Sequence, residues 1–305
     1  PEGDFPAGVT VHAREHIDRA MEEFREYEGC SVIVYDQGCA AELRRKRHRK
    51  LAPEPTERVF INTKVCEGCG DCSVQSNCIA IEPLETPMGR KREINQSACN
   101  VDLSCLKGFC PSFVTIKGVQ PRKGEGLELG DVALPEPPAP VPMEQPFNIA
   151  VTGVGGTGVL TIGGILGMAA HLDGKAAMVL DVSGLAQKGG AVISHVRIGN
   201  DPSHVSTPRI AGGCTDLLLA ADSVVAISRE GMDLISAERT SAIVNGHNAP
   251  VATFVRERDF DFQRDAVLQA IRDTVRPGAR IVDFQRLATR VIGDAIASNM
   301  MMVGY

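Results

Sequence analysis

The residues best suited to chemistry are cysteines: seven of the chain's ten lie in residues 66–110. Cys66, Cys69 and Cys72 follow one another with two residues between each pair. That spacing lets one tight loop place three thiolates around a cubane iron–sulfur cluster, while a remote Cys-Pro supplies the fourth. The sequence offers Cys110-Pro111, and two glycines between the first three cysteines give the loop the backbone freedom that close approach to inorganic sulfide needs.

A second group repeats this spacing with a carboxylate in the middle place, as Cys99, Asp102 and Cys105. In two-cluster ferredoxins each triplet takes its fourth ligand from beside the other triplet. We therefore expect one [4Fe–4S] cluster. A second would form only if a carboxylate can ligate iron and if spacers longer than the usual three residues allow it; otherwise the second group is a structural relic. The predicted ligands are Cys66, Cys69, Cys72 and Cys110 for the first cluster, and Cys78, Cys99, Asp102 and Cys105 for the second.

Two other uses of these cysteines are open. Zinc also takes four cysteines, although three thiolates at two-residue spacing followed by Cys-Pro differ from a zinc-ribbon pattern. A disulfide framework is disfavoured, because seven is an odd number and no secretory segment opens the chain.

The composition bounds the class of protein. At 305 residues the chain should hold two or three domains, and its net charge of −6 implies no general affinity for nucleic acid. No apolar run reaches membrane length, so we expect a cytoplasmic protein without membrane contact. The basic run Arg44–Lys50 is interpreted as a solvated helix end, or as a patch that steers an acidic electron carrier.

Residues 1–52 are expected to be the C-terminal end of an α/β domain. Apolar residues at helical spacing predict a helix over Arg14–Tyr27, the run Ser31–Tyr35 predicts a buried strand, and Cys39–Leu51 predicts a second helix. These elements cannot close a core by themselves. Since the chain also begins at Pro1 without Met, we expect it to be part of a longer protein.

The elements that must position the cysteines lie in residues 53–131, with strands expected at Arg58–Lys64 and Phe113–Lys117. Residues 132–146 form a Pro-rich linker. Residues 147–305 alternate strands and helices, which favours a mainly parallel sheet. Strands are predicted at Asn148–Val151, Ala177–Asp181, Ala191–Arg197, Val224–Ser228, Ala242–Val244 and Arg280–Asp283, and helices up to His171, after Gly212–Thr215, and over Arg264–Val275 and Phe284–Ser298.

A glycine-rich loop follows the first of these strands, with the form of a dinucleotide fingerprint. Its candidate cofactor-binding residues are Gly153, Gly155, Gly156 and Gly158, together with Gln187 and Lys188 from a later loop. Asp181 stands where an acid that binds ribose is expected. The other interpretation is a structural turn, and further glycines in the following helix predict close packing against a neighbour. His195 is interpreted as a core histidine.

These segments resemble the 2-oxoacid:ferredoxin oxidoreductases, and in particular the long fused bacterial indolepyruvate ferredoxin oxidoreductases. Residues 66–78 and 105–113 carry the most specific part of the resemblance. Residues 148–305 are similar to the gamma domain of the family through the glycine loop and Gln187–Gly190, and Tyr35–Glu42 resembles the end of its thiamine-diphosphate-binding domain. The implied fold is α/β: the tail of the thiamine domain, a ferredoxin-like iron–sulfur module, and a truncated Rossmann-like gamma domain.

The resemblance implies oxidative decarboxylation of aryl or branched 2-oxoacids, such as indolepyruvate, to acyl-coenzyme A. Electrons would pass through [4Fe–4S] clusters to ferredoxin. Thiamine diphosphate and Mg²⁺ would bind on other parts of the enzyme, because the Gly-Asp-Gly…Asn motif that holds them is missing here. We therefore assign no catalytic residue and expect this chain to be inactive alone; the family implies a homo-oligomer. The remaining alternatives are an iron–sulfur oxidoreductase dependent on NAD(P) or FAD, and a zinc-stapled assembly scaffold.

Overall fold

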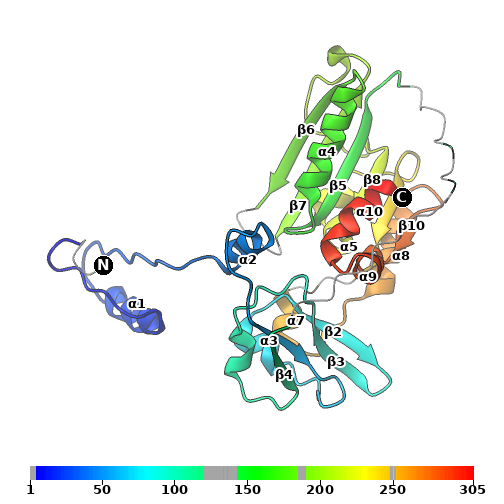
Figure 1. Cartoon of the computed structure of the whole chain (residues 1–305). Helices are drawn as coiled ribbons and strands as arrows, with labels where there is room; N and C mark the ends of the chain where they lie inside the picture. The colour runs from blue at the N-terminus through cyan, green and yellow to red at the C-terminus, as the bar shows by residue number, and fades with distance from the viewer. Residues whose placement is uncertain are drawn as a thin grey trace. The chain divides into compact units, whose positions relative to one another are not determined.

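The structure is a computed structural model, and it describes residues 5–119, 133, 136, 143–184, 190–247, 250 and 252–305. The chain divides into two compact units, Pro1–Glu54 and Pro55–Tyr305 (Figure 1). The domain boundaries expected at 52, 131 and 146 remain predictions. None of the helices in the described residues has the length and apolar character to cross a membrane.

In the first unit both expected helices are confirmed. They are the short 3₁₀ turn Arg14–His16 continuing into α1 (Ile17–Arg25), and α2 (Ala40–His48). The strand expected at Ser31–Tyr35 is wrong. Its residues are extended but pair with no other strand in the described part of the unit, and Val32 and Val34 are 74% and 79% exposed. A β-branched run becomes a strand only when a neighbour completes its hydrogen-bond ladder.

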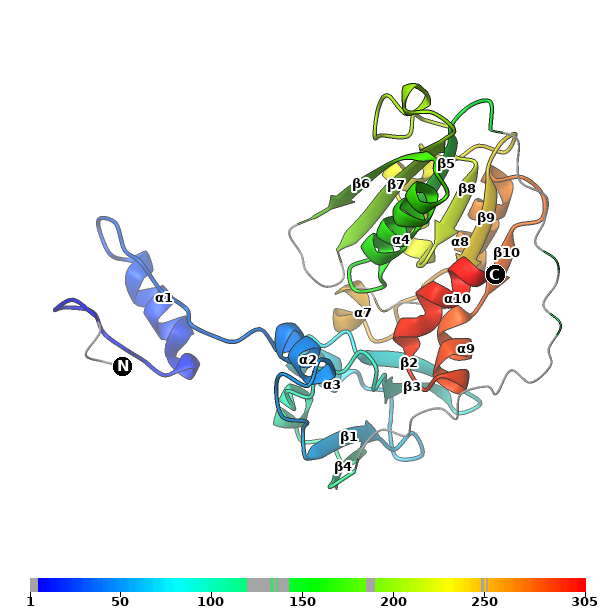
Figure 2. The same ribbon diagram turned by 45° about the horizontal axis from the view of Figure 1, so that its top comes forward.

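The second unit begins with two small antiparallel sheets that hold the cysteine loops (Figure 2). One sheet pairs the chain-distant strands β1 and β4, and the other is a hairpin of β2 and β3 that the sequence did not predict. The cysteine loops each lead into a short helix. The elements are β1 (Glu57–Ile61), α3 (Asp71–Ser76), β2 (Ile81–Thr86), β3 (Gly89–Ile94), the 3₁₀ helix Ser104–Lys107 and β4 (Phe113–Lys117).

The rest of the second unit is built on a six-stranded sheet of order β10-β9-β8-β5-β7-β6. Five strands run the same way and β7 alone is reversed, so the mainly parallel sheet is confirmed. Seven residues, 184–190, separate β6 from β7, too few for the dozen that a parallel crossover needs. The strands are β5 (Phe147–Val154), β6 (Ala176–Ser183), β7 (Ala191–Gly199), β8 (Leu217–Ala220), β9 (Ser241–Asn245) and β10 (Arg280–Val282).

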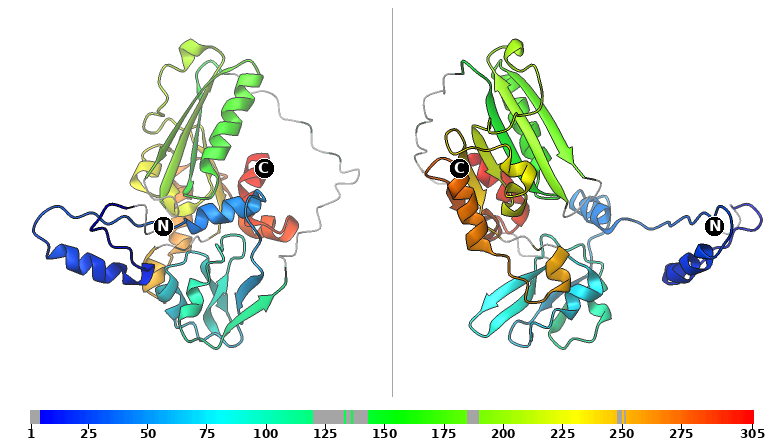
Figure 3. Two further views of the ribbon diagram at one scale, coloured as in Figure 1. Left: turned by 60° about the vertical axis from the view of Figure 1, so that its left-hand side comes forward. Right: turned by 180° about the vertical axis from the view of Figure 1, so that it is seen from behind.

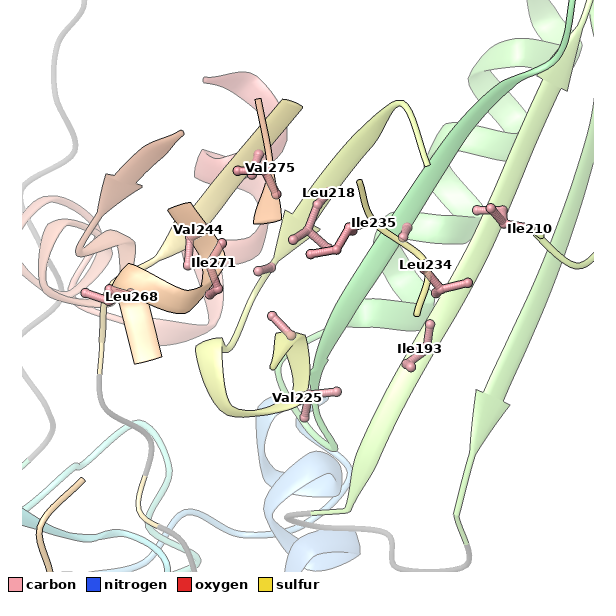
Figure 4. Close-up of a cluster of buried hydrophobic side chains, with 14 residues drawn as sticks. Ile193, Ile210, Leu218, Val225, Leu234, Ile235, Val244, Leu268, Ile271 and Val275 are labelled. Atoms are coloured by element: carbon pink, nitrogen blue, oxygen red, sulfur yellow. The ribbon is translucent and has the colours of Figure 1, made fainter. Parts of the chain in front are cut away.

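Helices cover both faces of this sheet. Because side chains alternate along a strand, Ile149 and Val151 of β5 pack on the face covered by α4 (Val159–Leu172), α9 (Phe284–Val291) and α10 (Ser298–Gly304). The opposite face is covered by α5 (Ser223–Ala226), α6 (Arg229–Met232) and α8 (Arg264–Thr274), seen from behind in Figure 3. Figure 4 shows this second core, to which the sheet contributes Leu218 and Val244 and the helices contribute Val225, Leu268 and Ile271.

Three expectations for residues 147–305 are wrong. Val224–Ser228 is not a strand, because the Asp222 carboxylate accepts the N–H groups of Val224 and Val225 and starts α5 there. The strand lies earlier, as β8, so Gly212–Thr215 leads into a strand rather than a helix. The helix expected over Phe284–Ser298 ends at Val291, before Gly293 at φ +84°, and a separate α10 follows.

Candidate cluster-binding site

The two cysteine loops repeat the same local structure 33 residues apart. The Asn62 carbonyl accepts the N–H of Cys66 at 2.9 Å, and the Asn95 carbonyl accepts the N–H of Cys99 at 3.0 Å. Each asparagine therefore closes a turn that aims the first cysteine of its triplet. Sequence reading missed these residues, although the recurrence of Asn four positions before Cys could have revealed them.

The backbone after each first cysteine also repeats. Gly68 and Gly70 have φ of +74° and +86°, and Val101 and Leu103 have φ of +53° and +59°. Glycine reaches this left-handed region freely, whereas a β-branched valine there is a true outlier. Such strain is retained where function requires the conformation.

Hydrogen bonds to sulfur complete the likeness between the loops. The N–H of Gly68 donates to Cys66 Sγ at 3.4 Å, and the N–H of Val101 donates to Cys99 Sγ at the same 3.4 Å. Donors aimed at sulfur stabilise the thiolate and tune a cluster held by it. When the two loops are aligned with their offset of 33 residues, Asp102 occupies the position that Cys69 has in the first loop.

Cys78 lies with the second triplet, although it follows the first in sequence. Burial, together with nearby Cys99 and Cys78, raises the pKa of Cys105 to about 12. Burial likewise raises the pKa of Cys99, with Cys78 and Asp102 adding to the effect. Cys78 and Asp102 thus lie close enough to Cys99 and Cys105 to influence both thiols, and their role as ligands of the second cluster stays a prediction.

The three thiols of the first triplet all interact electrostatically with the guanidinium of Arg92. Burial raises the pKa of Cys72. Cys110 lies 3.0 Å from the hydroxyl of Ser112 and lines a cavity of about 150 Å³ together with Cys72 and Cys105. Cys110 therefore faces the space between the two loops.

The donor set fits iron–sulfur chemistry. All seven cysteines of residues 66–110 are free, and Cys66 is buried beside Ile61 and Ile81. At Gly68 a Cβ would collide with the carbonyl oxygen of Arg90, so only glycine fits this loop. No three His, Cys, Asp or Glu side chains of the described chain are arranged to hold a metal ion, and the assignment of the eight ligands stays a prediction.

The glycine-rich loop between β5 and α4 is closely packed by the chain itself. Gly158 has φ +83°, and a Cβ there would collide with the side-chain amide of Asn299 on α10. At Gly153 a Cβ would lie 2.5 Å from Thr157 Oγ1 and 2.8 Å from Val159 Cγ2. These contacts support the structural interpretation of the loop. Gln187 and Lys188 lie outside the described residues.

The close packing predicted for α4 is present at two of its glycines. Gly163 lies against Ser194 of β7 and Gly167 against Val179 of β6, while Gly164 faces open space. His195 is a core histidine as predicted: it is 3% exposed, its Nδ1 accepts the N–H of Ile210 at 3.4 Å, and burial lowers its pKa.

A second cavity, of about 330 Å³, was not predicted. It lies between the β2–β3 hairpin and the ends of β9 and β10, and Glu82, His247 and Asp283 are among its lining residues. Glu82 Oε2 is 3.7 Å from His247 Nε2, and Asn95 donates to Glu82 Oε1 at 2.8 Å. Burial raises the pKa of Glu82 to about 7. No sequence signal joins positions so far apart.

Comparison with known sequences gives one family and several relatives. The family model described as pyruvate ferredoxin/flavodoxin oxidoreductase matches residues 148–305. A protein named indolepyruvate oxidoreductase subunit IorB from Pyrococcus horikoshii is 40% identical over 81 residues, 27% of this chain and 39% of that protein. One of the same name from Methanothermobacter thermautotrophicus is 28% identical over 159 residues, 52% of this chain and 76% of that protein. The match to the first relative thus spans about two fifths of its length.

Several solved structures are similar to part of the chain, among them two subunits of oxidoreductases. Pyruvate oxidoreductase subunit PORC from Thermotoga maritima is 21% identical, with 53% of this chain and 74% of that chain covered and a TM-score of 0.35. The gamma subunit of a keto/oxoacid ferredoxin oxidoreductase from Geobacter sulfurreducens is 22% identical, with 52% and 73% covered and a TM-score of 0.34.

Proposed function

This chain belongs to the pyruvate ferredoxin/flavodoxin oxidoreductase family, and from that membership we propose that it is the electron-relay part of an enzyme that oxidatively decarboxylates 2-oxoacids. The observation that carries the proposal is the repeat of the two cysteine loops in backbone conformation and in N–H···S bonds. Two like loops that exchange their fourth ligands suit two clusters within electron-transfer reach of each other.

For the substrate we propose an aryl or branched 2-oxoacid of the indolepyruvate type. The support is the name of the relatives that match the chain, indolepyruvate oxidoreductase subunit. The acyl product would leave on coenzyme A and the electrons on ferredoxin. The carbon chemistry would be supplied by thiamine diphosphate with Mg²⁺, bound on other parts of the assembly.

The role of this chain's own residues is to hold and shield the clusters. Cys66, Cys69, Cys72 and Cys110 would bind the first, and Cys78, Cys99, Asp102 and Cys105 the second. The small apolar core around Ile61 and Ile81 lies behind the loops and limits the access of water. Cluster binding would supply much of the stability of this small module, since its core is slight.

Electron delivery tests this proposal. The anaerobically reconstituted chain is reduced, excess reductant is removed, and oxidised ferredoxin is added. We expect ferredoxin reduction by the wild type, and its loss in a variant carrying both Cys66→Ser and Cys99→Ser. Cys30→Ser is the matched control, since Cys30 is an exposed cysteine of the first unit. Equal rates for the wild type and the double variant would contradict the proposal.

A nucleotide-dependent enzyme is the competing function, and equilibrium titration with NADH distinguishes it. The packing of Asn299 against Gly158 supports weak or no binding. Tight, stoichiometric binding of NADH that reduces the clusters would favour the nucleotide-dependent enzyme instead.

A further inference from the structure

Arg92 is a large charged side chain in a place where charge is costly. It lies on β3, is 1% exposed, and is among the largest fully buried side chains of the described chain. A buried guanidinium is stable only when it is paired or fully hydrogen-bonded. Its partners therefore indicate what the site is built to hold.

The neutral contacts of Arg92 come mainly from α7 (Ala252–Arg256) and the residues just after it. Its Nη2 donates to the Arg258 carbonyl at 3.0 Å, and its guanidinium lies 4.4 Å from the ring centroid of Phe254. Gly70 of the first cysteine loop packs here too, because a Cβ on it would lie 3.1 Å from Arg258 Cβ and 3.5 Å from Arg92 Nη2. Arg92 thus stands between the first loop and the sheet domain.

Among the described residues, these contacts leave the charge of Arg92 without an anionic partner. Its Nε is buried and has no hydrogen-bond partner in the described structure. The groups that favour its charged form are the thiols of Cys72, Cys66 and Cys69, while Arg90 opposes it. Neutral thiols are weak acceptors. The Arg92 guanidinium gains an anionic partner only if those sulfurs carry negative charge.

We infer that Arg92 is the buried counter-charge of the cluster held by the first loop, and that it raises the reduction potential of that cluster relative to the second. The inference rests on the proposed function, because it requires clusters. A cation near a cluster stabilises the added electron, and net charge is one of the determinants of potential. The second loop differs, since it carries the carboxylate of Asp102, and the arginine that acts on it, Arg58, is only half-buried.

Redox titration followed by EPR tests this role of Arg92. In Arg92→Gln we expect the midpoint potential of one cluster to fall while that of the other is unchanged, and in Arg92→Lys we expect a smaller fall. Arg90→Gln is the matched control: Arg90 lies on the same strand, donates to the Phe260 carbonyl and lies over the Phe262 ring, but unlike Arg92 it is not among the groups that act on the pKa of Cys72. Arg90→Gln should leave the midpoint potentials of both clusters unchanged.

Stability gives a second readout that a purely structural arginine would not show. With clusters bound, Arg92→Met should lower the melting temperature, because the counter-charge is lost. With iron removed by chelation, the same variant should melt at the same or a higher temperature than the wild type, because a buried unpaired cation has been removed. If Arg92 instead serves only to hold the Arg258 carbonyl by its hydrogen bond, Arg92→Met should melt at a lower temperature than the wild type both with clusters and with iron removed.

The outcomes separate this inference from the proposed function. Clusters present, with potentials unchanged in Arg92→Gln and Arg92→Lys, overturn the role of Arg92 and leave the electron relay intact. Wild-type protein without iron or sulfide after anaerobic reconstitution overturns both. If Arg92→Gln does not fold, a fall in the potential of one cluster in Arg92→Lys supports the inference, and unchanged potentials overturn it.

Discussion

The backbone N–H of Val101 donates to the sulfur of Cys99 at 3.4 Å with Val101 at φ +53°, a conformation that valine rarely adopts. The same bond joins glycine and cysteine in the first loop, at the same length. The second loop therefore has the same backbone conformation as the first, although it carries a valine where the first loop has the glycine that adopts this conformation most easily. This cost is explained if the second loop, like the first, has to wrap a cluster.

Substitutions at Gly68 and at Val101, which hold equivalent positions in the two loops, should have opposite effects on cluster binding. Gly68→Ala forces a Cβ into the Arg90 carbonyl, so we expect the first cluster to be lost and iron to fall by about half. Val101→Gly relieves a left-handed valine, and should keep all iron and slow its loss to chelators. Iron per chain and chelation rates check both. Full iron in Gly68→Ala would contradict the assigned loop geometry.

Asp102 should behave as a ligand of the second cluster. Asp102→Cys restores the thiolate found at Cys69, so we expect two clusters with an altered EPR signal for one. Asp102→Ala should lose about half of the iron. The control is Asp71→Ala, an exposed acid of the first loop at the start of α3. If Asp102→Ala retains both clusters with unchanged spectra, Asp102 is not a ligand.

Glu82 should make stability depend on pH. Glu82 is 8% exposed, and burial raises the pKa of its carboxyl from 4.5 to about 7. Between those values the unfolded state ionises while the folded state stays protonated, so stability falls as pH rises, by about 3 kcal/mol in total. Glu82→Gln should remove this dependence, which melting curves from pH 4.5 to 8 would show. The control is Glu85→Gln, at an exposed position on β2. Parallel pH curves for Glu82→Gln and wild type would contradict the burial of an ionisable group here.

Sequence reading found what depends on local spacing and missed what depends on distant contacts. The helix–strand alternation follows from periodicity and is present in the structure, while the assignment of Cys78 to the cluster of Cys99 stays a prediction. The stretch Val224–Ser228 has strand propensity, but one capping carboxylate, Asp222, made it a helix. Arg92 and the Glu82–His247 contact could not be predicted, because their partners are more than 150 residues away in sequence.

A larger side chain in the glycine-rich loop should destabilise the protein, because it collides with α10 and not because it blocks a nucleotide. Gly158→Ala combines a left-handed φ with a collision at Asn299, so we expect a loss of at least about 1–2 kcal/mol of stability. Adding Asn299→Ala should recover part of that loss, because it removes the collision but not the backbone strain. Urea unfolding of the two single variants and the double variant measures this coupling. Additive losses would contradict a direct contact.

The central claim is that the repeated loops hold two [4Fe–4S] clusters. It is tested most directly by iron, acid-labile sulfide and zinc content after anaerobic preparation, with EPR of the reduced protein. We predict about eight irons and eight sulfides per chain, and an EPR spectrum broadened by two interacting clusters. Stoichiometric zinc without iron or sulfide, in an EPR-silent protein, would contradict the electron relay and favour a zinc-stapled scaffold.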